Sequence, residues 1–198
     1  HLQTLIEKAL NNNPDLLNAA LNVDIAEQQV KAAKLSFLPS VVFAPTGTIS
    51  HFGTHTSSTQ SYSLPISASW EADLFGKLRS SKKAAQMAMI QAQDYKVYAQ
   101  TTLISSVANL YYTLLMLDRQ KQIVDDMLGL TKNTWDVMKL QMEFGRARST
   151  SVQSAEAAFY SVQTQAADIR RQIREAENTL SLLLGEPAQT IARGSLDN

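Results

Sequence analysis

The feature that most limits what this chain can fold into is a repeat of apolar residues over 103–142, in steps of four and three. Such steps place side chains along one face of a helix. The stretch 77–144 contains no proline and predicts one helix about 100 Å long, far longer than the usual 11–12 residues or so. Gly129 is a mild weakness inside it, where a break or kink could occur. Ten of the twelve repeat positions are apolar: Leu103, Val107, Leu110, Leu114, Leu117, Lys121, Val124, Leu128, Thr131, Trp135, Met138 and Met142.

A second repeat follows after the turn-like stretch 143–149. Gly145 suits a helix end that needs positive φ, and Ser149 suits the N-cap of a last helix over 150–184. Gly185 and Pro187 end that helix. Strict seven-residue spacing favours left-handed coiled-coil packing. All ten of its seam positions are apolar: Val152, Ala155, Phe159, Val162, Ala166, Ile169, Ile173, Ala176, Leu180 and Leu183.

Two shorter helices are predicted at the start of the chain, over 2–12 and 14–37. Asn13 is the expected N-cap of the second, with Pro14 at its first position and Pro39 beyond its end. Stacked end to end, this helix and the last one nearly equal the long helix in length and would lie antiparallel to it. The seam of the second helix is mostly small: Ala19, Val23, Ala26, Val30, Ala33 and Phe37.

Between the second predicted helix and the long helix, apolar residues recur at every second position. Tyr62, Leu64, Ile66, Ala68 and Trp70 alternate with Ser61, Ser63, Pro65, Ser67 and Ser69, which predicts a β-hairpin with arms at 40–53 and 60–73. Pro65 suggests an edge or an irregularity. Each arm reaches the 9–11 residues or so that a membrane-spanning strand needs. The pattern alone leaves two interpretations open, a membrane barrel strand pair and a soluble hairpin packed on a helix.

Composition excludes several functions. The 18 basic and 18 acidic residues balance, so no nucleic acid partner is indicated, and the chain has no cysteine. No apolar run is long enough for a transmembrane helix. His51 and His55 are best interpreted as exposed loop residues, and Asp125 and Asp126 as solvated charge. We therefore predict no enzyme activity, catalytic residue, cofactor or metal site.

Four motifs resemble a known family. The stretch Trp70–Lys77 resembles a strand-to-helix junction of the form Trp-x-x-Asp-Leu-Phe-Gly, and the other three motifs lie at 12–16, 145–155 and 178–187. Their order resembles one of the two repeats in outer membrane efflux channels of the TolC family, closest to the efflux lipoprotein branch. The match spans almost the whole chain.

The resemblance implies a mostly α fold, with long antiparallel coiled-coil helices and one β-hairpin, half of a TolC-like protomer. It divides residues 1–198 into helices (1–37), barrel hairpin (38–75), tunnel helix (77–144), return helix (149–185) and tail (186–198). Such channels are homotrimers in the Gram-negative outer membrane, with a helical tunnel in the periplasm. They are passive conduits for small molecules, working with a periplasmic adaptor protein and an inner membrane pump. A chain with one repeat is expected to be part of a longer protein, and the lipid-bearing cysteine of the lipoprotein branch is absent from these residues.

The resemblance also assigns residues. The tip for adaptor docking comprises Gly145, Arg146, Ala147, Arg148 and Ser149, although an ordinary turn with solvated arginines remains the alternative. The junction between barrel and tunnel comprises Trp70, Asp73, Phe75 and Gly76, with a structural role. The strand facing outer membrane lipid comprises Tyr62, Leu64, Ile66 and Ala68. The tail is expected to be poorly ordered. A soluble periplasmic coiled-coil scaffold or adaptor is the alternative function.

Overall fold

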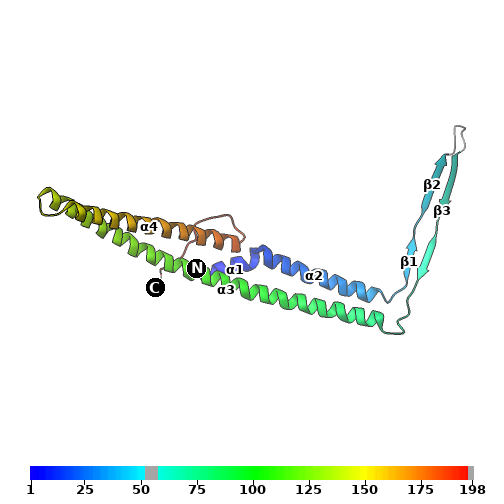
Figure 1. Ribbon diagram of the computed structural model, residues 1–198. Helices are drawn as coiled ribbons and strands as arrows, with labels where there is room; N and C mark the ends of the chain where they lie inside the picture. The colour runs from blue at the N-terminus through cyan, green and yellow to red at the C-terminus, as the bar shows by residue number, and fades with distance from the viewer. Residues whose placement is uncertain (52–57, 196–198) are drawn as a thin grey trace. The chain divides into compact units, whose positions relative to one another are not determined.

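The computed structural model describes residues 1–51 and 58–195. Four helices and four strands lie in these residues (Figure 1). They form two compact units, one of residues 1–18 with 97–198 and one of residues 19–96. The predicted turn 53–60 and the end of the tail lie partly outside the described residues. The elements are α1 (Leu2–Asn12), α2 (Pro14–Leu35), β1 (Ser40–Phe43), β2 (Thr46–His51), β3 (Ser58–Ser63), β4 (Ile66–Ser69), α3 (Lys77–Glu143) and α4 (Ser149–Leu183).

The core of the larger unit is the seam between α3 and α4, which run side by side (Figure 1). All ten predicted α4 positions and eleven of the twelve on α3 are buried or half-buried. Met142 is the exception, because it lies at the last turn of α3 and is exposed. Trp135 stacks on Phe159 across the seam, with ring centroids 5.4 Å apart. The helix continues through Gly129 without a break.

The predicted end-to-end stacking of helices is confirmed at one joint in this unit. The Asn13 side chain accepts a hydrogen bond from the Leu16 amide at 3.0 Å, so it caps α2 as predicted. Its amide group also donates to the Leu183 carbonyl of α4 at 3.0 Å. Gly185 (φ +67) follows α4, and a Cβ there would lie 2.5 Å from the Asn12 carbonyl oxygen. The close approach therefore requires glycine at this position.

The hairpin in the smaller unit is less regular than predicted. Its arms are each broken in two, because Pro45 and Pro65 lack the amide proton that a continuous ladder requires. β1 pairs with β4, from Ser40 opposite Ser69 to Phe43 opposite Ile66. β2 pairs with β3, from Thr46 opposite Ser63 to His51 opposite Ser58. Since β4 ends at Ser69, the predicted extension of this arm to residue 73 is wrong.

The tail is also different from the prediction. Ile191 is buried against the core, although the segment was expected to be poorly ordered. The physical reason is a set of polar contacts from residues 189–194 back onto α3 and α4. We call residues 186–195 the strap.

Candidate functional site

The tip turn between α3 and α4 is held entirely by backbone hydrogen bonds. Gly145 has φ +69, as predicted. Its amide donates to the Met142 carbonyl at 2.9 Å, and the Arg146 amide donates to the Gln141 carbonyl at 2.8 Å. This pair of bonds is a Schellman motif, which satisfies the last carbonyls of α3. The N-cap of α4 is Arg148, in extended conformation and without a side-chain capping bond, so the prediction of Ser149 as N-cap is wrong.

The tip leaves its side chains free to meet a partner. Arg146, Arg148 and Ser149 are exposed, and Ala147 is half-buried. Among the ion pairs of the described residues, none involves either arginine. Added atoms at Gly145 would meet nothing within 4 Å. The structure thus brings the five predicted tip residues together as a compact positively charged surface.

Charged side chains hold the junction turn in place. The Asp73 carboxylate accepts from the Leu78 amide at 3.2 Å and from the Arg79 amide at 3.1 Å. It therefore satisfies free donors at the start of α3, as its predicted structural role requires. Gly76 has φ +79, which suits glycine. The Lys77 ammonium binds Glu71 at 2.8 Å, and this hydrogen bond raises the pKa of Lys77 above its ordinary value.

The apolar residues of the junction point into solvent in this chain. Phe75 is 99% exposed and Leu74 is 83% exposed. Trp70 lies beyond the end of β4, and its indole donates to the Phe37 carbonyl at 3.2 Å. Nearby is an open hollow of about 610 Å³. Its lining is part apolar and part hydroxyl, and includes Leu35, Leu38, Ser40, Ser69 and Trp70.

The strands carry one apolar and one hydroxyl-rich face. Register places Val41 opposite Ala68 and Phe43 opposite Ile66, so these four side chains share a face. The other face is rich in serine and threonine, with pairs such as Thr46 with Ser63 and Thr48 with Ser61, although it also places Val42 opposite Ser67. The predicted lipid-facing residues Tyr62, Leu64, Ile66 and Ala68 are all exposed, and Leu64 lies in the break between β3 and β4.

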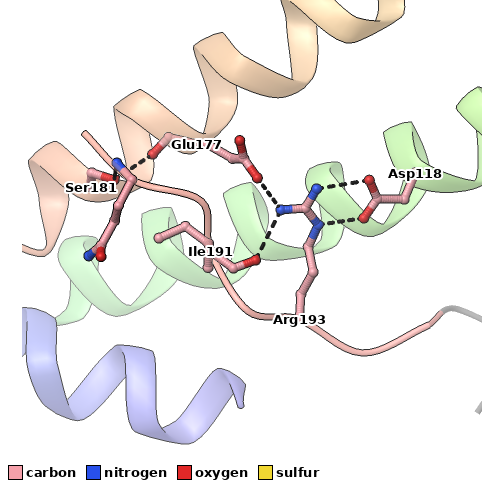
Figure 2. Close-up of polar contacts among 6 residues, drawn as sticks. Asp118, Glu177, Ser181, Ile191 and Arg193 are labelled. Atoms are coloured by element: carbon pink, nitrogen blue, oxygen red, sulfur yellow. Dashed lines mark hydrogen bonds and ion pairs between the residues drawn. The ribbon is translucent and has the colours of Figure 1, made fainter.

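The strap holds a cluster that sequence reasoning missed (Figure 2). Two nitrogens of the Arg193 guanidinium bind the two oxygens of Asp118 on α3, one at 2.8 Å. A third contact joins Arg193 to Glu177 on α4 at 2.5 Å. The hydrogen bonds that Arg193 donates to Asp118 raise the pKa of Arg193 above its usual range, against the opposing effect of burial. No local pattern could have found this cluster, because its partners are 75 and 16 residues away.

A second apolar line on α3 was also missed, although its signal was present. Ile123, Met127, Leu130, Val137 and Phe144 follow one another at steps of four, three, seven and seven, and the first four each lie one residue before a position of the α4-facing seam. The polar residues Thr134 and Gln141 occupy the two intervening positions of this line. All five are exposed. We call these five residues the second seam. A helix with two such lines is expected to pack against two helices, not one.

Other kinds of site find little support in the described part of the chain. No cluster of three or more possible metal ligands occurs there. His51, interpreted above as a loop residue, is the last residue of β2, so that interpretation is wrong. His55 lies outside the described residues. None of the described helices has a stretch apolar enough to cross a lipid bilayer.

Comparison with known proteins agrees with the fold. Residues 5–186 match the family model described as outer membrane efflux protein. The chain is 28% identical over 191 residues to the toluene efflux pump outer membrane protein TtgC of Pseudomonas putida, covering 93% of this chain and 40% of TtgC. It is 26% identical over 203 residues to the cation efflux system protein CusC of Escherichia coli, covering 100% of this chain and 44% of CusC.

Solved structures show the same likeness. The crystal structure of CusC superimposes with a TM-score of 0.80 at 24% identity, over 98% of this chain and 46% of CusC. The open state of the MtrE outer membrane channel of Neisseria gonorrhoeae gives a TM-score of 0.78 at 26% identity, over 99% of this chain and 45% of MtrE. The chain spans less than half the length of each of these relatives.

These findings confirm the resemblance drawn from four sequence motifs, together with the TolC-like fold and the outer membrane localisation that it implied. They test none of the individual residues assigned to the tip, the junction or the strand. With a family model matched over 182 of its 198 residues, from 5 to 186, the chain belongs to the outer membrane efflux protein family.

Proposed function

We propose that this chain is part of a subunit of an outer membrane channel in a tripartite efflux system. The channel is a passive conduit for small molecules through the periplasm and the outer membrane, and it has no enzymatic activity. Subunits form a homotrimer, to which a periplasmic adaptor protein and an inner membrane pump couple. Family membership favours this function over a soluble scaffold.

The observation that carries the proposal is the second seam on α3. Its five exposed apolar residues lie on one helix that already buries a first seam against α4. A surface helix of a monomer is polar on the side away from its partner. Two apolar lines on one helix are instead what a wall of neighbouring helices needs, since each helix must contact a neighbour on both sides.

The hairpin supports the membrane part of the proposal. Its ladders separate an apolar face from a hydroxyl-rich face, as a strand between lipid and a wet lumen requires. A hairpin alone would leave edge amides and carbonyls without partners in hydrocarbon. Closure with further strands is therefore part of the proposal, with Tyr62, Leu64, Ile66 and Ala68 toward lipid.

The tip supports the coupling part. Arg146 and Arg148 stand exposed on a turn that backbone hydrogen bonds alone hold in place. An adaptor that binds there would present acidic groups to the two guanidinium groups. Gly145 fixes the direction of the turn.

The test of the channel is to express the full-length protein in a Gram-negative host lacking its own channel. We expect it in the outer membrane fraction, as a trimer after crosslinking, and restoring export. A monomeric protein in the soluble fraction would overturn the proposal.

Gly145→Pro is expected to reduce export while the crosslinked trimer yield stays unchanged, because proline cannot adopt φ +69. Unchanged export would instead remove the tip from the coupling surface.

A further inference from the structure

We propose that the junction is a membrane anchor, in which Leu74 and Phe75 insert among the acyl chains of a phospholipid leaflet. A collar of four basic residues near them binds the lipid phosphates: Lys31, Lys34, Lys82 and Lys83. Lys77 and Arg79 pair with Glu71 and Asp73 within the turn. The anchor deepens the proposed function, since it needs the hairpin to stand in a membrane. It explains why the turn keeps two large apolar side chains in solvent in the isolated chain.

Leu74 and Phe75 are the two most exposed large apolar residues in the described part of the chain. They are adjacent in sequence, so they form one projection. A lone exposed apolar side chain is ordinary on a protein surface, whereas a projecting pair has a partner to meet.

The turn is built to hold this pair outward. Asp73, which precedes the pair, accepts hydrogen bonds from two amides at the start of α3. Gly76, which follows the pair, adopts positive φ. The Leu74 amide donates to the Ala72 carbonyl at 3.0 Å. The ion pair of Lys77 with Glu71 closes the turn from the other side. The polar groups of the turn thus bind one another and leave the apolar pair to an outside partner.

Charge identifies that partner as phospholipid. Residues 31–37 and 71–83 contain six basic side chains and two acidic ones, Glu71 and Asp73. The first turn of α3 has no acidic residue, although helix N-termini favour acidic side chains. Four basic residues stand within its first seven positions instead. A surplus of positive charge beside an apolar projection matches the anionic phosphates above an acyl layer.

Dimensions agree with this assignment. Lys77 and Lys83 are separated by about 9 Å along the helix, close to the headgroup layer of about 5–8 Å on each side of a bilayer. Lysine stems can also reach upward to the phosphates. Trp70 is 67% exposed beside the hairpin base, and tryptophan is enriched at this interface.

These 198 residues contain no cysteine, so an introduced cysteine is the single labelling site in this part of the protein, and any free cysteine elsewhere in the full-length channel is first replaced by serine. Phe75→Cys is placed in the full-length channel, in vesicles of phosphatidylethanolamine and phosphatidylglycerol at three to one. We expect frequent collisions with oxygen and few with a water-soluble nickel chelate. Ile66→Cys in β4 tests whether the strand faces lipid. Leu130→Cys on α3 is the control, because a label there should contact water or protein and not lipid.

The outcomes separate the two proposals. Lipid accessibility at position 66 with water accessibility at position 75 would overturn the anchor and leave the channel standing. Water accessibility at both positions would overturn the channel and the anchor together. An immobile label at position 75 that neither reagent reaches would show that another protein segment covers the junction, which also overturns the anchor.

A second measurement tests the collar without altering the apolar pair. Spin-labelled phosphatidylglycerol should associate with the channel more strongly than spin-labelled phosphatidylcholine. Replacing Lys82 and Lys83 by glutamine should reduce this preference by at least twofold. The matched control replaces Lys96 and Lys132, farther along α3, and should leave it unchanged. Equal loss in both variants would show that the collar has no special role.

Discussion

Helices α3 and α4 end in the same way but in different surroundings. Each finishes with a glycine at positive φ, Gly145 (+69) and Gly185 (+67). Each glycine amide bonds three residues back, and the next amide bonds five residues back, to Gln141 after α3 and to Ser181 after α4. Around Gly145 the space is open, whereas at Gly185 the Asn12 carbonyl would touch an added Cβ.

This comparison shows that one local motif serves two opposite purposes. After α4 the chain is held against α1 and α2 through Gly185 and Asn13, and the strap returns over α3. After α3, a Cβ added at Gly145 would meet none of the described residues within 4 Å. The motif ends a helix in both places, and only distant residues decide whether the end is a joint or a free tip.

The largest expected effect separates these two glycines directly. Gly185→Ala should destabilise the protein by about 3 kcal/mol or more, because the cost of positive φ, about 1–2 kcal/mol, adds to a clash with backbone. Gly145→Ala should cost only the first part, about 1–2 kcal/mol. Urea unfolding in detergent, followed by far-UV circular dichroism, measures both. Equal losses would show that the joint is looser than the structure indicates.

The second prediction concerns the strap that leaves the joint. Arg193→Met leaves Glu177 without its partner, at 9% side-chain exposure, and Asp118 at 34%. We expect a loss of about 2–3 kcal/mol, below the 3–5 kcal/mol or so of a fully buried pair because Asp118 remains partly solvated.

The matched control for the strap is Arg171→Met on α4. Arg171 binds Glu175 four residues away at 2.7 Å, and both side chains are more than half exposed. Exposed pairs of this kind contribute little to stability, so Arg171→Met should cost far less than Arg193→Met. If both substitutions cost the same small amount, the strap is not a stabilising element.

Local patterns predicted most of this fold because the forces that set it are local. Seam positions follow from helical periodicity, and the turn at Gly145 follows from the positive φ that a helix end needs. The Asn13 cap also acts within three residues. The strap escaped prediction because Arg193 needs partners from two other helices. The strand breaks at Pro45 and Pro65 were only partly predicted, because the alternation of apolar and polar residues continues across Pro65.

The candidate sites also differ in whether local or distant residues determine them. The position and conformation of the tip could be predicted, since Gly145 sets both. Whether Arg146 and Arg148 bind an adaptor depends on another protein, and whether Tyr62 and Ile66 face lipid depends on further strands. Those assignments remain predictions.

The smallest expected effect on stability lies at the tip, and it isolates coupling from folding. Arg146→Ala with Arg148→Ala should change the free energy of unfolding by less than about 0.5 kcal/mol, since both side chains are exposed and the turn is held by backbone bonds. Export should nevertheless fall, because an acidic partner surface would lose two charge-assisted contacts. Substitution of both by lysine keeps the charge and should restore part of the activity, although lysine lacks the planar fork of arginine. The measurement is export beside trimer yield and unfolding for the three proteins. If the double alanine variant exports normally, the tip is a plain helical turn. The tip and the joint at Gly185 would then differ in packing but not in function.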